Sequence, residues 1–208
     1  MNPSSFQIVA YLYWLLLLII TSGSLVFAIL AFRRQKPQFA AISAGALAAA
    51  LMVAALPSPG GQTVSGVLLG MLALGLAVVG GGPAALLALR LATNNSVPPG
   101  QHGGILVENG GATSGTDVAG PTAPAEPGTF VHEVLRGGLM IGILERLAVA
   151  GAILAGFPEA IAVVVAIKGV GRFTELATAE ARERFIIGTL ASLIWACACA
   201  ALVQIALT

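Results

Sequence analysis

Apolar residues gather in six long stretches, separated by short polar segments or by segments rich in glycine and proline. A helix of about 20 apolar residues crosses the hydrocarbon core of a bilayer, which is about 30 Å thick. The pattern therefore predicts an all-α, polytopic membrane protein with six transmembrane helices, at residues 6–32, 39–56, 63–91, 135–156, 160–173 and 185–207. The run Gly80-Gly81-Gly82-Pro83 interrupts the third stretch and predicts one long, kinked helix.

Cationic side chains near the predicted helix ends indicate how the helices are oriented. Arg33, Arg34 and Lys36 follow the first helix. If successive helices alternate in direction, the remaining cations near helix ends fall on the same side: Arg90, Arg136, Arg172, Arg182 and Arg184. The segments on the opposite side contain no Lys or Arg. Because cytoplasmic loops are enriched in these residues, we expect six spans with both termini outside.

The segment 93–130 differs in composition from the rest of the chain. It is rich in Gly, Pro, Asn, Ser and Thr and contains no Lys or Arg. Such a composition cannot bury a core, so it predicts a flexible linker, which the orientation places in the cytoplasm. The chain is therefore expected to consist of an N-terminal three-helix part (1–92), the linker (93–130) and a C-terminal three-helix part (131–208).

Composition limits the classes of function. The chain has 208 residues, of which 57% are hydrophobic and 9% charged, whereas about 25% are charged in a typical soluble domain. The formal net charge of +1 gives no reason to expect nucleic acid as a partner. We find neither metal-ligand spacing nor a nucleophile beside a base, so we expect no metal, no cofactor and no catalytic residue.

The strongest candidate site consists of charges inside the predicted membrane helices. Glu145 and Arg146 lie in the fourth stretch, with Lys168 and Arg172 in the fifth. Glu145 follows Arg136 by nine residues, about 13 Å of helix, which places it near the membrane midplane. The fourth and fifth helices form an antiparallel hairpin, so an ion pair of Glu145 with Lys168 or with Arg172 is expected.

This charge set has three open interpretations. The formal charges of Glu145, Arg146, Lys168 and Arg172 sum to +2, so a further acid such as Glu175, water or an anionic ligand is needed. The set can be an internal ion-pair network that fixes helix packing. It can instead bind an anionic group such as a lipid phosphate, or form part of an ion or proton pathway through Glu145.

Small residues mark further packing positions. Gly66 and Gly70 in the third stretch, and Gly138 and Gly142 in the fourth, are each spaced by four residues. Glycines at this spacing let the backbones of two membrane helices approach closely. We therefore expect both pairs to lie at helix contacts.

Four motifs lie in part of the C-terminal half: Gly138-x-x-Ile141-Gly142-x-Leu144-Glu145-Arg146, Pro158-Glu159-Ala160-Ile161, Lys168-x-x-x-Arg172-Phe173-x-Glu175 and Arg184-Phe185-Ile186-Ile187-Gly188-Thr189-Leu190-x-Ser192. This part of the chain resembles a family of uncharacterised bacterial multi-pass membrane proteins. The resemblance covers about 30% of the chain, between residues 135 and 195. It implies a three-helix membrane element in a bacterial plasma membrane and no particular reaction.

These patterns together favour a non-enzymatic integral membrane protein, either an accessory subunit or a scaffold. In this hypothesis the charges fix helix packing, and an anionic lipid is a candidate ligand. The alternative is a small ion or solute transporter or channel whose pathway passes Glu145. A lipid-modifying membrane enzyme is the third hypothesis. Expected partners are membrane lipids, further copies of the chain or a larger membrane complex.

Overall fold

The chain folds into a bundle of helices. The computed structural model describes residues 3–57, 63–92, 138–171 and 179–208, and within these ranges every regular element is a helix. The helices are α1 (Pro3–Arg34), α2 (Pro37–Ala54), α3 (Thr63–Ala92), α4 (Gly138–Leu154), α5 (Ala160–Gly171) and α6 (Ala179–Leu207). The all-α prediction is confirmed, and α3 is one helix that continues through Pro83.

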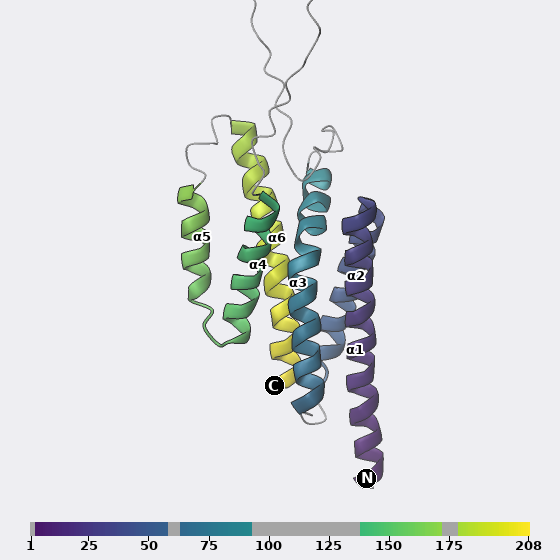
Figure 1. Cartoon of the computed structure of the whole chain (residues 1–208). Coiled ribbons are helices and arrows are strands. Elements are labelled where there is room, and N and C mark those ends of the chain that lie inside the picture. The colour runs from purple at the N-terminus through teal and green to yellow at the C-terminus, as the bar shows by residue number, and fades with distance from the viewer. Residues whose placement is uncertain (1–2, 58–62, 93–137, 172–178) are drawn as a thin grey trace, which may run out of the picture.

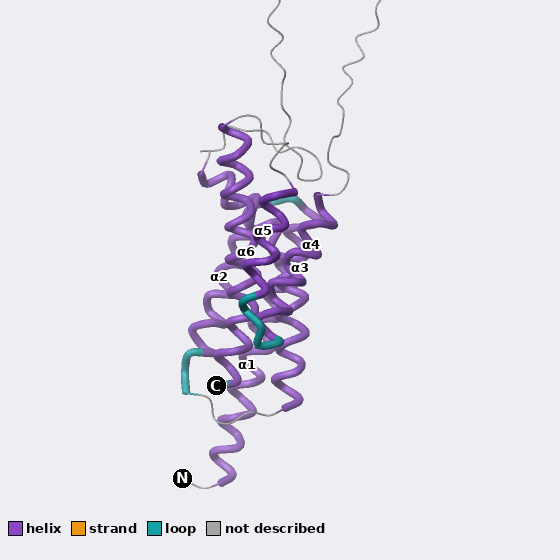
Figure 2. The backbone as a smooth tube through the Cα atoms, turned by 90° about the vertical axis from the view of Figure 1, so that its left-hand side faces the viewer, coloured by secondary structure: helices purple, strands orange, loops and turns teal. Residues whose placement is uncertain are grey.

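Successive helices run in opposite directions and lie alongside one another (Figures 1 and 2). Four of them, α1, α2, α3 and α6, are long and apolar enough to cross a membrane. α4 has 17 residues and α5 has 12, about 18 Å of helix for the latter. The chain is therefore an integral membrane protein with several candidate spans, while six spans and their orientation stay a prediction.

The centre of the bundle is the pair α3 and α6, which share the most extensive helix contact. α1 packs on α2 and α3, whereas α4 packs on α3 and α6. The buried residues between the central helices are largely small, among them Ala73, Ala77, Ala196 and Ala200. The closest pairing thus joins helices from the two sides of segment 93–130, which lies outside the described residues. The division of the chain into three domains stays a prediction.

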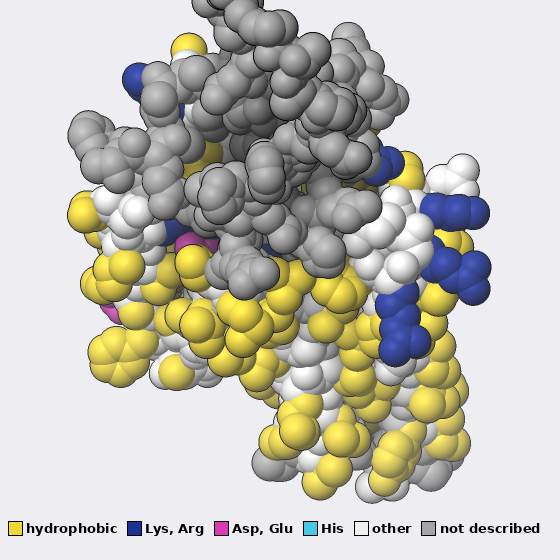
Figure 3. Space-filling model, turned by 45° about the horizontal axis from the view of Figure 1, so that its top comes forward, with side chains coloured by type: hydrophobic (Ala, Val, Ile, Leu, Met, Phe, Trp, Pro, Cys, Tyr) yellow, Lys and Arg dark blue, Asp and Glu magenta, His cyan; other side chains and the backbone are white. Residues whose placement is uncertain are grey.

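The flanks of the bundle are apolar (Figure 3). In α1, for example, Leu12, Ile19 and Val26 are each more than half exposed, as expected for side chains that face lipid. α5 has no buried residue and packs mainly on α4. Its position therefore depends on few contacts, which makes its link to α4 important.

A tight turn connects α4 to α5. Gly156 has a φ of +78°, a conformation that side chains with a Cβ rarely adopt. The Phe157 N–H donates to Ala152 O at 2.8 Å, and the Gly156 N–H donates to Ile153 O at 3.0 Å. This pattern is a Schellman motif, which satisfies the last carbonyls of α4. The turn makes α5 antiparallel to α4 and so brings Lys168 opposite Glu145.

Two serines join α1 to α2 inside the bundle. The hydroxyl of Ser24 donates to the backbone carbonyl of Ser43 at 2.8 Å, and the Ser43 hydroxyl donates to the Ser24 carbonyl at 2.8 Å. Both residues are buried. Polar side chains in membrane helices commonly join neighbouring helices in this way.

Replacement of Ser24 by Ala should destabilise the fold because it removes this reciprocal contact. We expect the free energy of unfolding of the full chain in mixed micelles to fall by about 0.5–1.5 kcal/mol. Thr21→Val is the matched control, since the buried Thr21 hydroxyl has no hydrogen-bond partner among the described residues. Equal losses in the two variants would mean that the serine contact contributes nothing specific.

Candidate functional site

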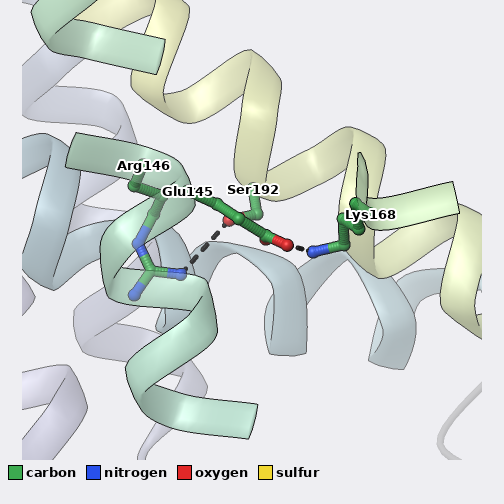
Figure 4. Close-up of polar contacts among 4 residues, drawn as sticks. All are labelled: Glu145, Arg146, Lys168 and Ser192. Atoms are coloured by element: carbon green, nitrogen blue, oxygen red, sulfur yellow. Dashed lines mark hydrogen bonds and ion pairs between the residues drawn. The ribbon is translucent and has the colours of Figure 1, made fainter. Parts of the chain in front are cut away.

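Arg146 connects three helices of the bundle. It lies on α4, and 8% of its surface is exposed. Its Nε donates to the Val78 carbonyl of α3 at 2.9 Å, and its Nη1 donates to the Ser192 hydroxyl of α6 at 3.3 Å (Figure 4). An arginine deep in a membrane costs about 2.5–3.5 kcal/mol on insertion scales. Hydrogen bonds inside the protein offset that cost, so the contact also holds α4 against α3 and α6.

The glycine run Gly80–Gly82 makes this contact sterically possible. A Cβ at Gly81 would overlap the Cδ of Arg146 and lie 3.2 Å from the Ser192 hydroxyl. The bare backbone therefore lets the arginine side chain cross α3 and reach the Val78 carbonyl. Gly142, one turn before Arg146 on α4, leaves room on the other side: a Cβ there would be 3.0 Å from the guanidinium Nη1.

Trp195 of α6 uses the same glycine run. It is buried, and its Nε1 donates to the Leu76 carbonyl at 3.0 Å. A Cβ at Gly80 would lie 2.5 Å from the Trp195 ring, so only glycine leaves enough space. Two side chains from two other helices thus donate to carbonyls of α3 that are two residues apart.

Pro83 follows the glycine run and explains part of its composition. Proline has no N–H, and its ring pushes against the carbonyl four residues earlier, which loosens the helix there. A residue with a Cβ directly before proline is disfavoured in a helix, whereas Gly82 has none. The bare backbone of the glycine run makes this part of α3 an accessible acceptor surface.

Glu145 and Lys168 form a second, separate contact. Their side chains are 12% and 17% exposed, and the Lys168 Nζ is paired with the Glu145 Oε2 (Figure 4). The same Nζ lies 5.7 Å from the centre of the Phe185 ring of α6, within cation–π range. This pair therefore joins α5 to α4, and it places the Lys168 ammonium next to α6.

The predicted buried cluster of Glu, Arg and Lys is not present as one unit. Of its described members, Arg146 alone is buried, and it bonds to α3 and α6, whereas Glu145 turns to Lys168 on α5. Successive residues on a helix point about 100° apart, so neighbours such as these face different helices. Arg172 and Glu175 lie outside the described residues.

The predicted packing glycines lie at different kinds of contact. A Cβ at Gly66 would be 2.8 Å from Leu207, and one at Gly70 would be 4.0 Å from Val203, so both face α6. Gly142 lies under the Arg146 guanidinium, and Gly138 is the first residue of α4. Sequence reasoning missed Gly81 and Ser192 as neighbours of Arg146, and it missed Gly80 as the position that makes room for Trp195. The available signal was the glycine run before a proline in an apolar helix.

Two hollows among the described residues lie away from these charges. One lies at the junction of α1, α2 and α3, and the other lies between α2 and α6. Glu145, Arg146 and Lys168 line neither of them. Cys197 and Cys199 are free thiols, and the described residues contain no group of three or more His, Cys, Asp or Glu that could hold a metal.

Comparisons with known proteins identify no family for this chain. No protein-family profile matches it, and neither a curated protein nor a solved structure is significantly similar. The resemblance of residues 135–195 to a bacterial membrane-protein family thus finds no support beyond several helices that can span a membrane.

Replacement of Gly80 by Ala should disturb the packing of α6 on α3. The added Cβ would meet the rigid Trp195 ring, and we expect the free energy of unfolding to fall by about 1–3 kcal/mol. Trp195 fluorescence should shift to longer wavelength as the ring loses its buried position.

Gly75→Ala is the matched control on the same helix. A Cβ at Gly75 would make only ordinary contact with Leu25, at 3.9 Å. This variant should be at least as stable as the wild type because alanine favours the helix. A Gly80→Ala variant as stable as Gly75→Ala would contradict the described packing.

Proposed function

We propose that this chain is a non-enzymatic scaffold or accessory subunit of a bacterial plasma membrane, in which fixed helix packing is the functional property. It has six spans and both termini outside. Its partners are membrane lipids and further membrane proteins or copies of the chain. The fixed packing lets the apolar flanks present a constant surface to those partners.

The observation that carries this proposal is that the charged side chains of α4 and α5 bond to other residues of the protein. Arg146 donates to Val78 O and to the Ser192 hydroxyl, and Lys168 donates to Glu145. Ionisable residues inside a membrane commonly pair with one another or with backbone carbonyls. The described contacts join neighbouring helices in this way, as a role in fixing the packing requires.

The proposed orientation rests on cations at one end of the bundle. Because the helices alternate in direction, Arg33, Arg34, Arg90 and Arg182 all lie near the end at which α1 and α3 finish and α6 begins. Figure 3 shows Lys and Arg side chains gathered toward that end. The positive-inside rule assigns this end to the cytoplasm.

A small transporter or channel with a pathway past Glu145 is the alternative, and it is favoured by the partial exposure of the Glu145–Lys168 pair at the edge of the bundle. A pathway would need an open route to the carboxylate, which neither of the two hollows provides. A lipid-modifying enzyme would need a reactive group in a cleft that lipid can enter.

A double-mutant cycle on the ion pair tests the scaffold proposal. Glu145→Gln leaves the Lys168 ammonium without its carboxylate, and Lys168→Met leaves the carboxylate alone. Each single variant should lose about 2–3 kcal/mol of unfolding free energy and should be produced at a lower level. The double variant should recover most of both, because neither Glu145 nor Lys168 is then left as a charge without its partner.

Glu159→Gln provides the control, since Glu159 is an exposed acid in the α4–α5 turn and should tolerate the change. The alternative makes a different prediction for proton and K⁺ flux into proteoliposomes. A wild-type flux that disappears in a stable double variant would overturn the scaffold proposal and support a pathway.

A further inference from the structure

Two hollows of opposite character lie along α2. The first is at the end of the bundle where α1 turns into α2 and where α3 ends, and it is lined by Lys36, Pro37, Ala40 and Arg90 among others. Its volume is about 20 Å³, enough for one oxygen-sized group. The second is a wide, shallow groove of about 330 Å³ between α2 and α6.

Both hollows open on the same face of α2. Pro37 and Ala40 line the first, and Ala44, Ala48 and Leu51 line the second. Residues three or four apart share a helix face, so these positions form one stripe. Ala40 and Ala44 are one turn apart, about 6 Å along the axis. The groove therefore begins about one helical turn beyond the cationic hollow along α2.

The chemistry of the two hollows is complementary to one kind of molecule. Lys36 and Arg90 supply two positive charges at the first hollow, and among the described residues no Asp or Glu lines it. The groove is lined only by apolar residues, with Ala191, Trp195 and Ala198 on the α6 side. A phosphate suits the first hollow and a hydrocarbon chain suits the second. A molecule that carries both is an anionic phospholipid of the leaflet at the cationic end.

We propose that one anionic phospholipid binds along this face of α2, with its phosphate between Lys36 and Arg90 and one acyl chain in the groove between α2 and α6. This site is separate from Arg146 and Lys168, which bond to other residues of the protein. The site rests on α2 and is independent of the proposed scaffold role.

Native mass spectrometry tests the headgroup part of the proposal. The full chain is released from detergent micelles that contain either phosphatidylglycerol or phosphatidylcholine. We expect one phosphatidylglycerol to stay bound and phosphatidylcholine to be lost. The variant Lys36→Gln/Arg90→Gln removes both cations of the hollow. The matched control Arg33→Gln/Arg34→Gln removes two exposed cations at the end of α1, which do not line it.

The hollow variant should lose affinity for phosphatidylglycerol by about tenfold or more relative to the control, as for the loss of charge-assisted hydrogen bonds. Equal losses in the two variants would mean diffuse attraction to any cation and would overturn the proposal. Retention of phosphatidylcholine as tightly as phosphatidylglycerol would overturn it as well.

The chain half is tested by filling the groove. Ala48→Leu/Ala191→Leu places bulk on both walls and should lower phosphatidylglycerol binding while Lys36 and Arg90 are intact. Ala49→Leu, at an exposed neighbouring position outside the groove, should leave binding unchanged. Unaltered binding in the filled variant would exclude the groove. A lipid-independent dimer that the filled variant loses would assign the groove to a second copy instead.

Discussion

A guanidinium inside an apolar helix bundle must find its hydrogen-bond acceptors in the protein, because hydrocarbon offers none. Arg146 meets this constraint on the backbone of α3 and at the Ser192 hydroxyl. Main-chain carbonyls of a helix are normally screened by side chains, so the contact requires a stretch of α3 without them. Gly80 and Gly81 provide that stretch.

The positions of α4 and α5 depend on this contact of Arg146. Arg146 fixes α4 against the central pair α3 and α6, and the Gly156 turn then brings α5 back along α4. α5 buries no residue, so the pairing of Lys168 with Glu145 and its contact with the Phe185 ring are its main polar links. The Arg146 contacts hold α4, and the Lys168–Glu145 pair then holds α5 against α4. The position of α5 therefore depends on that of α4.

The helices themselves could be predicted from apolar stretches, because a chain in lipid must bond its own backbone within each segment. The observed bounds differ by a few residues: α6 begins at Ala179, because the charged stretch before the apolar segment 185–207 belongs to the same helix. The ion pair of Glu145 with Lys168 was accessible from hairpin geometry, because equal distances from a turn place residues opposite each other.

The sequence did not show toward which helices the Arg146 side chain points. Adjacent positions on α4 face different neighbours, and which neighbour each meets depends on helices that are far apart in the chain. The pairing of α3 with α6 across segment 93–130 has no local signal either. The glycine run was interpreted as a kink because its second property, space for side chains of other helices, appears only when those helices are in place.

The central claim is that Arg146 crosses α3 over Gly81, and a suppression experiment tests it most directly. Gly81→Ala should lower the unfolding free energy of the full chain in mixed micelles by about 1–3 kcal/mol, since the new Cβ overlaps the arginine. In an Arg146→Ala background the same substitution should be neutral or slightly stabilising, because the overlapping side chain is gone. An equal loss in both backgrounds would show that Arg146 does not lie on the glycine run.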